Sequence, residues 1–130
     1  MSTELVMLAA SIVLGFVHIV LASHAASLQR GYRWTAGPRN ADVPPLRGVA
    51  GRLARASQNF LETFPFFAAA VLAAHVAGRE GALTLWGAHL YVWARLVYLS
   101  LYAFGVPLVR SLAWNVATAG IFLVLAALAV

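Results

Sequence analysis

Four long apolar segments occupy most of this chain of 130 residues. They cover residues 5–28, 53–77, 82–104 and 112–130. A helix rises about 1.5 Å per residue, so each segment is long enough to cross the roughly 30 Å of hydrocarbon in a bilayer. Only 10% of the residues are charged, against about 25% in an average soluble domain. The sequence therefore predicts one all-α membrane domain over residues 1–130, with four spans.

The connections between these segments predict how the helices run. Those around residues 78–81 and 105–111 are short, so neighbouring helices are expected to be antiparallel, in an up-down-up-down bundle. The long connection over 29–52 is rich in glycine and proline, which predicts that it holds no regular helix. The first segment follows a leader without positive charge and exceeds the apolar core of about 7–15 residues of a signal peptide, so we expect a permanent helix.

The arginines predict the orientation of the bundle. The chain has no lysine, and six of its nine arginines lie between the first segment and the start of the second. Arg110 lies between the third and fourth segments, whereas Arg79 is balanced by Glu80. Cytoplasmic loops carry an excess of basic residues, so the first and third connections are expected in the cytoplasm and both termini outside it. The net charge of +5 comes without a basic helix, and nucleic-acid binding is not expected.

Polar residues inside the apolar segments are the candidates for function. A charge at bilayer depth costs roughly 2.5–3.5 kcal/mol even on lenient insertion scales, and marks a functional site by default. Arg55, Asn59 and Glu62 have the spacing i, i+4, i+7 and share one helix face. Glu62 and Arg95 each lie about 15 Å from the cytoplasmic end of their segments. We expect these two to pair, because an unpaired buried charge would be very costly.

Residues nearer the cytoplasm extend this group into a positively charged funnel. They are Arg55, Tyr102, Arg110 and, less directly, Arg30. A purely structural ion pair explains the buried charges poorly, since such pairs rarely improve stability over apolar packing. The pattern favours a site for a small anionic ligand from the cytoplasm. The histidines lack metal-ligand spacing and there is no cysteine, so no metal site is expected.

The segment RASQNFLETFP over residues 55–65 resembles the second-helix signature R-x-x-x-N-x-x-E-x-x-P of the membrane-associated proteins in eicosanoid and glutathione metabolism (MAPEG). Arg95, Tyr102 and the segment 107–111 extend the resemblance over the whole chain. It implies a bacterial member of the family in the inner membrane, assembled as a homotrimer of four-helix protomers. Glutathione would bind between subunits near the cytoplasmic side. The residues at matching positions are Arg30, Arg55, Asn59, Glu62, Arg95, Tyr98, Tyr102, Arg110 and Ser111.

The chemistry of glutathione suits these residue types. The tripeptide carries two carboxylates, for which guanidinium groups are good partners, and one ammonium, which Glu62 could hold. Arg110 and Ser111 match the family's location for stabilising the thiolate. The resemblance thus implies a glutathione-dependent transferase or peroxidase, with glutathione as cosubstrate and a lipophilic electrophile arriving from the membrane lipid. The alternative is a non-catalytic membrane protein that binds a lipid or a partner in the same cavity.

Overall fold

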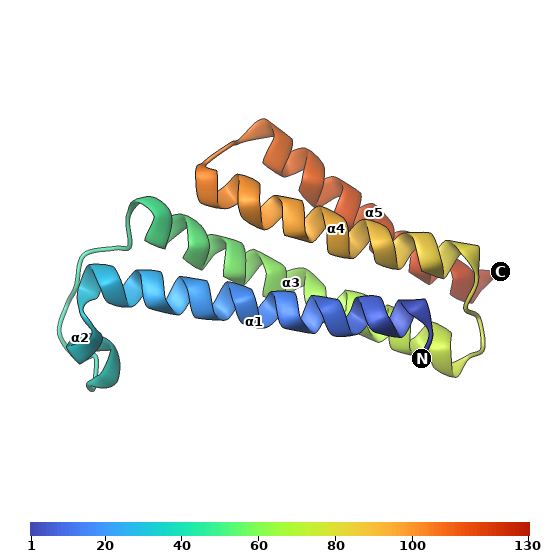
Figure 1. Cartoon of the computed structure of the whole chain (residues 1–130), viewed down its shortest axis with the longest axis horizontal. Helices are drawn as coiled ribbons and strands as arrows, with labels where there is room; N and C mark the ends of the chain where they lie inside the picture. The colour runs from blue at the N-terminus through green and yellow to red at the C-terminus, as the bar shows by residue number, and fades with distance from the viewer.

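The computed structural model describes all residues 1–130 and contains only helices and connecting segments. Four long helices, α1 (Thr3–Arg30), α3 (Gly48–Val76), α4 (Ala82–Phe104) and α5 (Leu108–Ala129), alternate in direction. A short helix, α2 (Tyr32–Ala36), lies beyond the end of α1 (Figure 1). Both termini and the α3–α4 turn lie at the opposite end of the molecule (Figure 1). The all-α fold class is confirmed.

The presence of α2 shows that the expectation of no regular helix in the connection 29–52 is wrong. Gly31 ends α1 with a positive φ of 93°, and a new helical turn begins directly after it. The amide of Thr35 donates to the carbonyl of Gly31 at 3.2 Å, and the Thr35 hydroxyl lies 2.8 Å from that of Ser27. The turn is therefore held by the end of α1, a tertiary contact that glycine and proline content does not reveal.

Two helices begin a turn or more earlier than the hydropathy pattern predicts, and α1 begins two residues earlier, at Thr3. α3 begins at Gly48 rather than at residue 53, and α5 at Leu108 rather than at 112. A Cβ atom on Gly51 would lie 2.8 Å from the carbonyl oxygen of Leu46, so the close approach of the preceding loop requires glycine there. The early start of α5 places Arg110 in its first turn.

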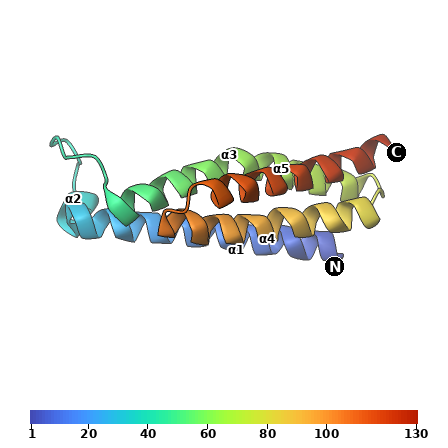
Figure 2. The ribbon, with the colours of Figure 1, turned by 90° about the horizontal axis from the view of Figure 1, so that it is seen from above.

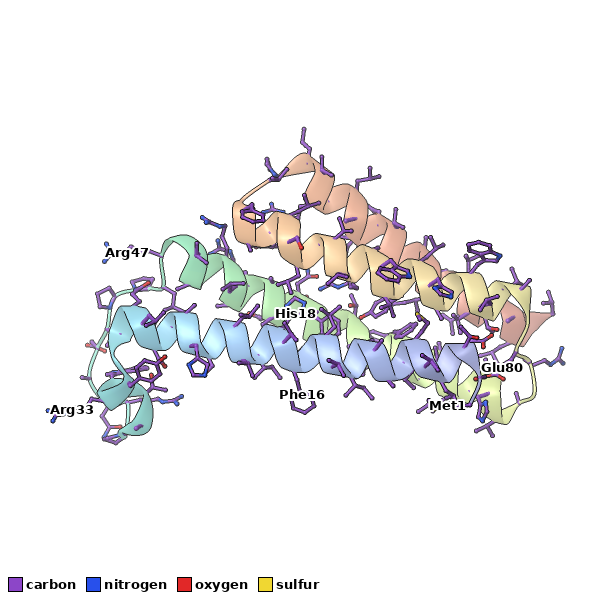
Figure 3. All side chains as sticks on the ribbon, viewed as in Figure 1. Met1, Phe16, His18, Arg33, Arg47 and Glu80 are labelled. Atoms are coloured by element: carbon purple, nitrogen blue, oxygen red, sulfur yellow. The ribbon has the colours of Figure 1, made fainter.

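Aromatic side chains join α1, α3 and α4 in the middle of the molecule. Phe60 of α3 stacks on His18 of α1 with ring centroids 4.9 Å apart, and Phe67 stacks on Tyr91 of α4 at 4.0 Å. His18 is buried on the inner side of α1, whereas Phe16 points away from the bundle (Figure 3). These stacks hold α3 against both neighbours at the depth of the buried polar residues.

Helices α4 and α5 cross at a pair of glycines. A Cβ atom on Gly87 would lie 2.6 Å from the carbonyl oxygen of Gly120, and one on Gly120 would lie 2.6 Å from that of Gly87. The two backbones are therefore in direct contact, as small residues permit between membrane helices. From this crossing the helices diverge toward their connecting turn at residues 105–107 (Figure 1).

Three helices are long and apolar enough to cross a membrane: α1, α3 and α5. α4 has 23 residues, but His89 and Arg95 interrupt its apolar sequence and it does not reach the same hydropathy. Seen from above, the long helices lie nearly along one common direction, as expected for a bundle (Figure 2). Fold and composition together describe a multi-pass membrane protein.

At the end that holds both termini, an exposed cluster joins the N-terminus to the α3–α4 turn. The Ser2 hydroxyl donates to the Glu80 carboxylate at 2.7 Å, and Nδ1 of His75 lies 2.9 Å from the same oxygen. Figure 3 shows Met1 and Glu80 at this end. The hydrogen bond from Ser2, followed by that from His75, lowers the pKa of Glu80 below its ordinary value of 4.5.

This lowered pKa predicts an acid-sensitive contribution to stability. Because the folded state binds the Glu80 proton less tightly than the unfolded state, the contribution is present above pH 4.5 and is lost as the pH falls below it. Lowering the pH from about 6 to about 4 should therefore reduce the Tm of the unmutated protein more than that of Glu80→Gln. Asp42→Asn, at an exposed loop carboxyl, serves as control. Equal losses of Tm in the unmutated protein and Glu80→Gln would show that the cluster does not couple to folding.

Candidate functional site

A polar pocket of about 260 Å³ opens between α3, α4 and α5, near the turn that joins α4 to α5. Its lining combines one guanidinium group with hydroxyl, amide and indole groups and contains no carboxylate. The seven lining residues are Asn59, Tyr98, Tyr102, Arg110, Ser111, Trp114 and Asn115. The first five are among the residues predicted from the sequence, and the structure brings them together from three helices.

Tyr102 of α4 lies between two guanidinium groups at this pocket. Nε of Arg55, from α3, donates to the Tyr102 hydroxyl at 3.1 Å. The guanidinium of Arg110, from α5, lies over the Tyr102 ring at 4.5 Å from its centroid. A tyrosine ring attracts a cation without neutralising its charge, so the arginines keep N–H donors for an anion. The guanidinium groups of Arg55 and Arg110 therefore both lie beside Tyr102 at the mouth of the pocket.

Arg95 is buried beneath the pocket, and its partner differs from the one expected. The residue is 0% exposed, and its Nη1 donates to the Asn59 side-chain oxygen at 2.8 Å. Its guanidinium also lies over the Tyr98 ring, 4.3 Å from the centroid. Because Asn59 and Tyr98 both line the pocket, Arg95 supports the floor of the pocket from below without reaching its interior.

The expected ion pair between Glu62 and Arg95 is not formed. The only salt bridge in the chain joins His75 to Glu80, and Glu62 is exposed on the surface of the protomer. Glu62 lies three residues after Asn59, which rotates it by roughly 60° around α3 at 3.6 residues per turn. Its carboxylate is exposed and forms no salt bridge with Arg95. Equal depth in the membrane, as expected from the sequence, does not determine which residue of α3 contacts Arg95.

Arg30 also lies apart from the pocket within the protomer. Its Nη2 donates to the carbonyl of Pro44 at 3.3 Å, and its guanidinium lies 5.0 Å from the centroid of the Trp34 ring. The side chain therefore ties the end of α1 to α2 and to the loop that follows. The loop folds back over α1 and engages this guanidinium locally, which the sequence pattern did not reveal.

Trp114 and Asn115 line the pocket but were not predicted. They follow Arg110 and Ser111 by four residues, so all four share one face of α5. Extending the Arg110–Ser111 motif by one helical turn would have found them. The Trp114 indole N–H is buried without a partner in the protein, and the Asn115 amide donates to the Ser111 carbonyl at 3.0 Å. Both residues add hydrogen-bonding capacity to the inner wall.

No group of histidine, cysteine or carboxylate side chains in the chain could hold a metal ion. The pocket instead offers positive charge at its mouth, aromatic rings along α4, and neutral donors and acceptors along α5. The N-terminus of α5, the positive end of its helix dipole, lies at the same place. Such a lining suits a small polar anion and can favour the ionised form of an acidic group.

Fold and site together define a helical membrane protein with a polar, arginine-containing pocket near one end of its bundle. The model of the MAPEG family matches residues 7–130, and the chain therefore belongs to the MAPEG family. This match confirms the family that the segment 55–65 indicated. A search of the curated proteins found no match.

Proposed function

We propose that this protein is a glutathione-dependent transferase or peroxidase acting on lipophilic electrophiles. Membership of a glutathione-related membrane family supports the class of reaction. The observation that carries the site is the convergence of Arg55 and Arg110 on Tyr102, beside Ser111 and without an opposing carboxylate in the pocket. Paired guanidinium groups favour a ligand with carboxylates, since charge-assisted hydrogen bonds are the stronger ones.

Each side chain has a role in this proposal. Arg55, exposed at the mouth, holds a glutathione carboxylate, while Asn59 and Tyr98 bind the peptide portion from the floor. Arg95 acts through these two residues as a positioning residue. Glu62 takes the ammonium group.

The assembly proposed is a homotrimer with glutathione between subunits. Glu62 and Arg30 lie outside the pocket of their own protomer, and a neighbouring subunit would give both of them access to the ligand. The ligand would then contact residues from two chains. This arrangement follows from the family resemblance, and it accounts for the exposure of Glu62 on the protomer surface.

The chemical step would use the thiolate of glutathione. Arg110 and the N-terminus of α5 favour loss of the thiol proton to water at the pocket mouth. The Ser111 hydroxyl donates to the Pro107 carbonyl at 3.4 Å. With glutathione bound, it would donate to the sulfur in place of that carbonyl. In a transferase reaction the electron pair of the sulfur forms a C–S bond to the electrophile. Either a leaving group then departs from the electrophile, or the oxyanion that forms on the electrophile takes a proton. In a peroxidase reaction two glutathione molecules become the disulfide, while a hydroperoxide is reduced to alcohol and water.

The proposal places four spans, including α4, in the inner membrane of a bacterium. The buried guanidinium of Arg95 is covered on all sides by protein and therefore does not meet lipid. A charge that faces the interior of a bundle is tolerated in a spanning helix. The Arg95 guanidinium, which interrupts the apolar sequence of α4, belongs to the proposed site through its hydrogen bond to Asn59.

The proposed topology gives a direct expectation. The arginines cluster at the α1–α3 connection, where Arg33 and Arg47 project at the end opposite Met1 and Glu80 (Figure 3). This connection is expected in the cytoplasm and the C-terminus outside it. Reporter fusions after residue 40 and after Val130 should therefore give opposite signals. A cytoplasmic reporter signal at both positions would rule out the four-span orientation.

The function is tested by measuring glutathione affinity in detergent, followed by turnover with a generic aromatic electrophile. Saturable glutathione binding and turnover above the uncatalysed rate are expected. Arg79→Leu, which alters an exposed arginine at the other end of the molecule, should leave both unchanged. Binding without turnover would favour the non-catalytic alternative, and absence of both would exclude a glutathione enzyme.

A further inference from the structure

The short helix α2 and the loop that follows it form a basic, aromatic surface at one end of the molecule. α2 lies beside the end of α1, on the side away from α4 and α5 (Figure 1). The 28 residues of α1 give it a length of about 42 Å, which matches the roughly 40–45 Å of a bilayer with its headgroup layers. Helix α1 therefore brings α2 to the depth of the lipid headgroups.

This surface carries positive charge that the protein does not neutralise. Residues 30–47 contain four arginines and one acidic residue, Asp42. The only salt bridge in the chain lies at the opposite end of the molecule, so none of these arginines is paired with a carboxylate. Tyr32 and Trp34 are of the residue types enriched at membrane interfaces. An anionic partner from outside the chain would complement this surface.

Two guanidinium groups gather on the ring of Trp34. That of Arg30 lies 5.0 Å from the centroid of the ring, and that of Arg39 lies 5.7 Å from it. Backbone carbonyls hold both groups in place, since Nη2 of Arg30 donates to Pro44 at 3.3 Å and Nε of Arg39 donates to Thr35 at 3.0 Å. Arginines that only mark topology need no such fixed geometry. We call Arg30, Trp34 and Arg39 the Trp34 cluster.

The Trp34 cluster holds two N–H groups that lack an acceptor. Nε of Arg30 and the indole nitrogen of Trp34 are both buried without a hydrogen-bond partner. Each of them can only donate, and a buried donor without an acceptor is costly. Arg39 is exposed and uses only its Nε within the chain, so its terminal N–H groups remain available. Three side chains thus offer donors to an oxygen-rich anion that enters from the solvent side.

We propose that the Trp34 cluster binds the phosphate group of an anionic phospholipid. Phosphate oxygens accept charge-assisted hydrogen bonds from guanidinium groups, and these are stronger than neutral ones. With four arginines against one carboxylate, the surface favours a headgroup of net negative charge over one that also carries an ammonium group. The proposed topology places this end in the cytoplasm, where anionic lipids make the membrane surface negative.

Lipid binding at this surface does not require the proposed glutathione chemistry. Arg30 is also one of the residues that match the family's glutathione site, so it is left unchanged in the tests. Arg39 and Trp34 lie outside that set and carry the test. A protein that retains the anionic lipid but binds no glutathione would reject the proposed function and keep this inference.

Native mass spectrometry of the protein released from detergent micelles measures the binding. The micelles contain equal amounts of phosphatidylglycerol, which is anionic, and phosphatidylcholine, which is zwitterionic, with acyl chains that give distinct masses. The unmutated protein should retain phosphatidylglycerol preferentially, and equal retention of the two lipids would overturn the proposal. An equal amount of glycerol phosphate should not displace the lipid. Displacement would indicate a site for soluble phosphate, which also overturns the proposal.

Arg39→Gln should lower the preference for phosphatidylglycerol by about 5-fold or more, the contribution of one arginine near an anionic membrane surface. Arg33→Gln is the matched control, because it removes the same charge from an exposed residue of α2 that projects from this end of the molecule (Figure 3). Salt screens such surface charges, so the control should change the preference by less than about 2-fold. Equal losses in the two variants would show diffuse attraction without a defined site and would overturn the proposal.

Trp34→Phe tests the unpartnered indole N–H itself. Phenylalanine keeps an aromatic ring for both guanidinium groups but has no N–H to donate. The preference for phosphatidylglycerol should fall by about 2- to 10-fold, the worth of one hydrogen bond. A variant that retains the lipids in the same ratio as the unmutated protein would show that the phosphate does not bind at the Trp34 cluster.

Discussion

Replacing Arg110 with leucine is expected to reduce the kcat of the glutathione-dependent reaction by about 10- to 1,000-fold, with a much smaller loss of glutathione affinity. The guanidinium lies at the pocket over Tyr102. Its interaction with sulfur strengthens as the thiol ionises, so the loss falls mainly on the chemical step. Steady-state kinetics with saturating glutathione and a generic aromatic electrophile measure the effect.

Arg55→Leu is the informative comparison for this result. Arg55 is exposed at the pocket mouth and hydrogen-bonds the Tyr102 hydroxyl. A carboxylate anchor acts equally in the ground state and the transition state, so this variant should raise the KM for glutathione and change kcat little. If Arg110→Leu behaved in the same way as Arg55→Leu, the assignment of Arg110 to the thiolate would be wrong.

The second large effect concerns stability. Asn59→Leu should lower the free energy of unfolding by about 1.5–3 kcal/mol, because it removes a hydrogen bond to a charged group. Arg95 is 0% exposed, and Asn59 at 2.8 Å is the hydrogen-bond acceptor for its guanidinium. Leucine has a similar size but cannot accept, so a buried charge would lose that bond. Thermal unfolding in detergent provides the measurement.

Two further variants decide whether Asn59 is the true partner of Arg95. The double change of Asn59→Leu with Arg95→Met should cost less than the sum of the single changes, because contacting residues are not additive. Glu62→Gln should change the Tm little, since the Glu62 carboxylate is exposed and unpaired in the protomer. Additive losses for Asn59→Leu and Arg95→Met would show that Asn59 is not the partner of Arg95. Strong coupling between Glu62→Gln and Arg95→Met would restore the ion pair that depth alone suggested.

The length of each apolar segment was sufficient to predict the long helices, including α4, whose polar residues lower its hydropathy. The bounds of α4 were predicted as 82–104 and are observed as Ala82–Phe104. The short helix α2 was missed because the contact between Thr35 and Ser27 that holds it is tertiary. The early start of α3 at Gly48 was missed because its first residues are polar or small, and hydropathy marks the apolar part of a helix.

The candidate site was predictable where the family signature supplied residue identities. Tyr98, Tyr102, Arg110 and Ser111 meet at one pocket as expected. The partner of Arg95 was not predictable, because spacing shows only that Asn59 and Glu62 lie on similar faces of α3. Helix geometry separates them by roughly 60°, but which of the two contacts Arg95 depends on how α3 is rotated against α4, and tertiary packing sets that orientation.

The central claim, that this pocket binds glutathione and ionises its thiol, is tested most directly by ultraviolet difference spectroscopy at neutral pH. Mixing the unmutated protein with glutathione should produce the absorbance band of a thiolate, because nearby positive charge lowers a thiol's pKa. Arg110→Leu should bind glutathione without producing the band, and S-methylglutathione should produce none with either protein. A protein that binds no glutathione, or that binds it and leaves the thiol protonated, would contradict the account.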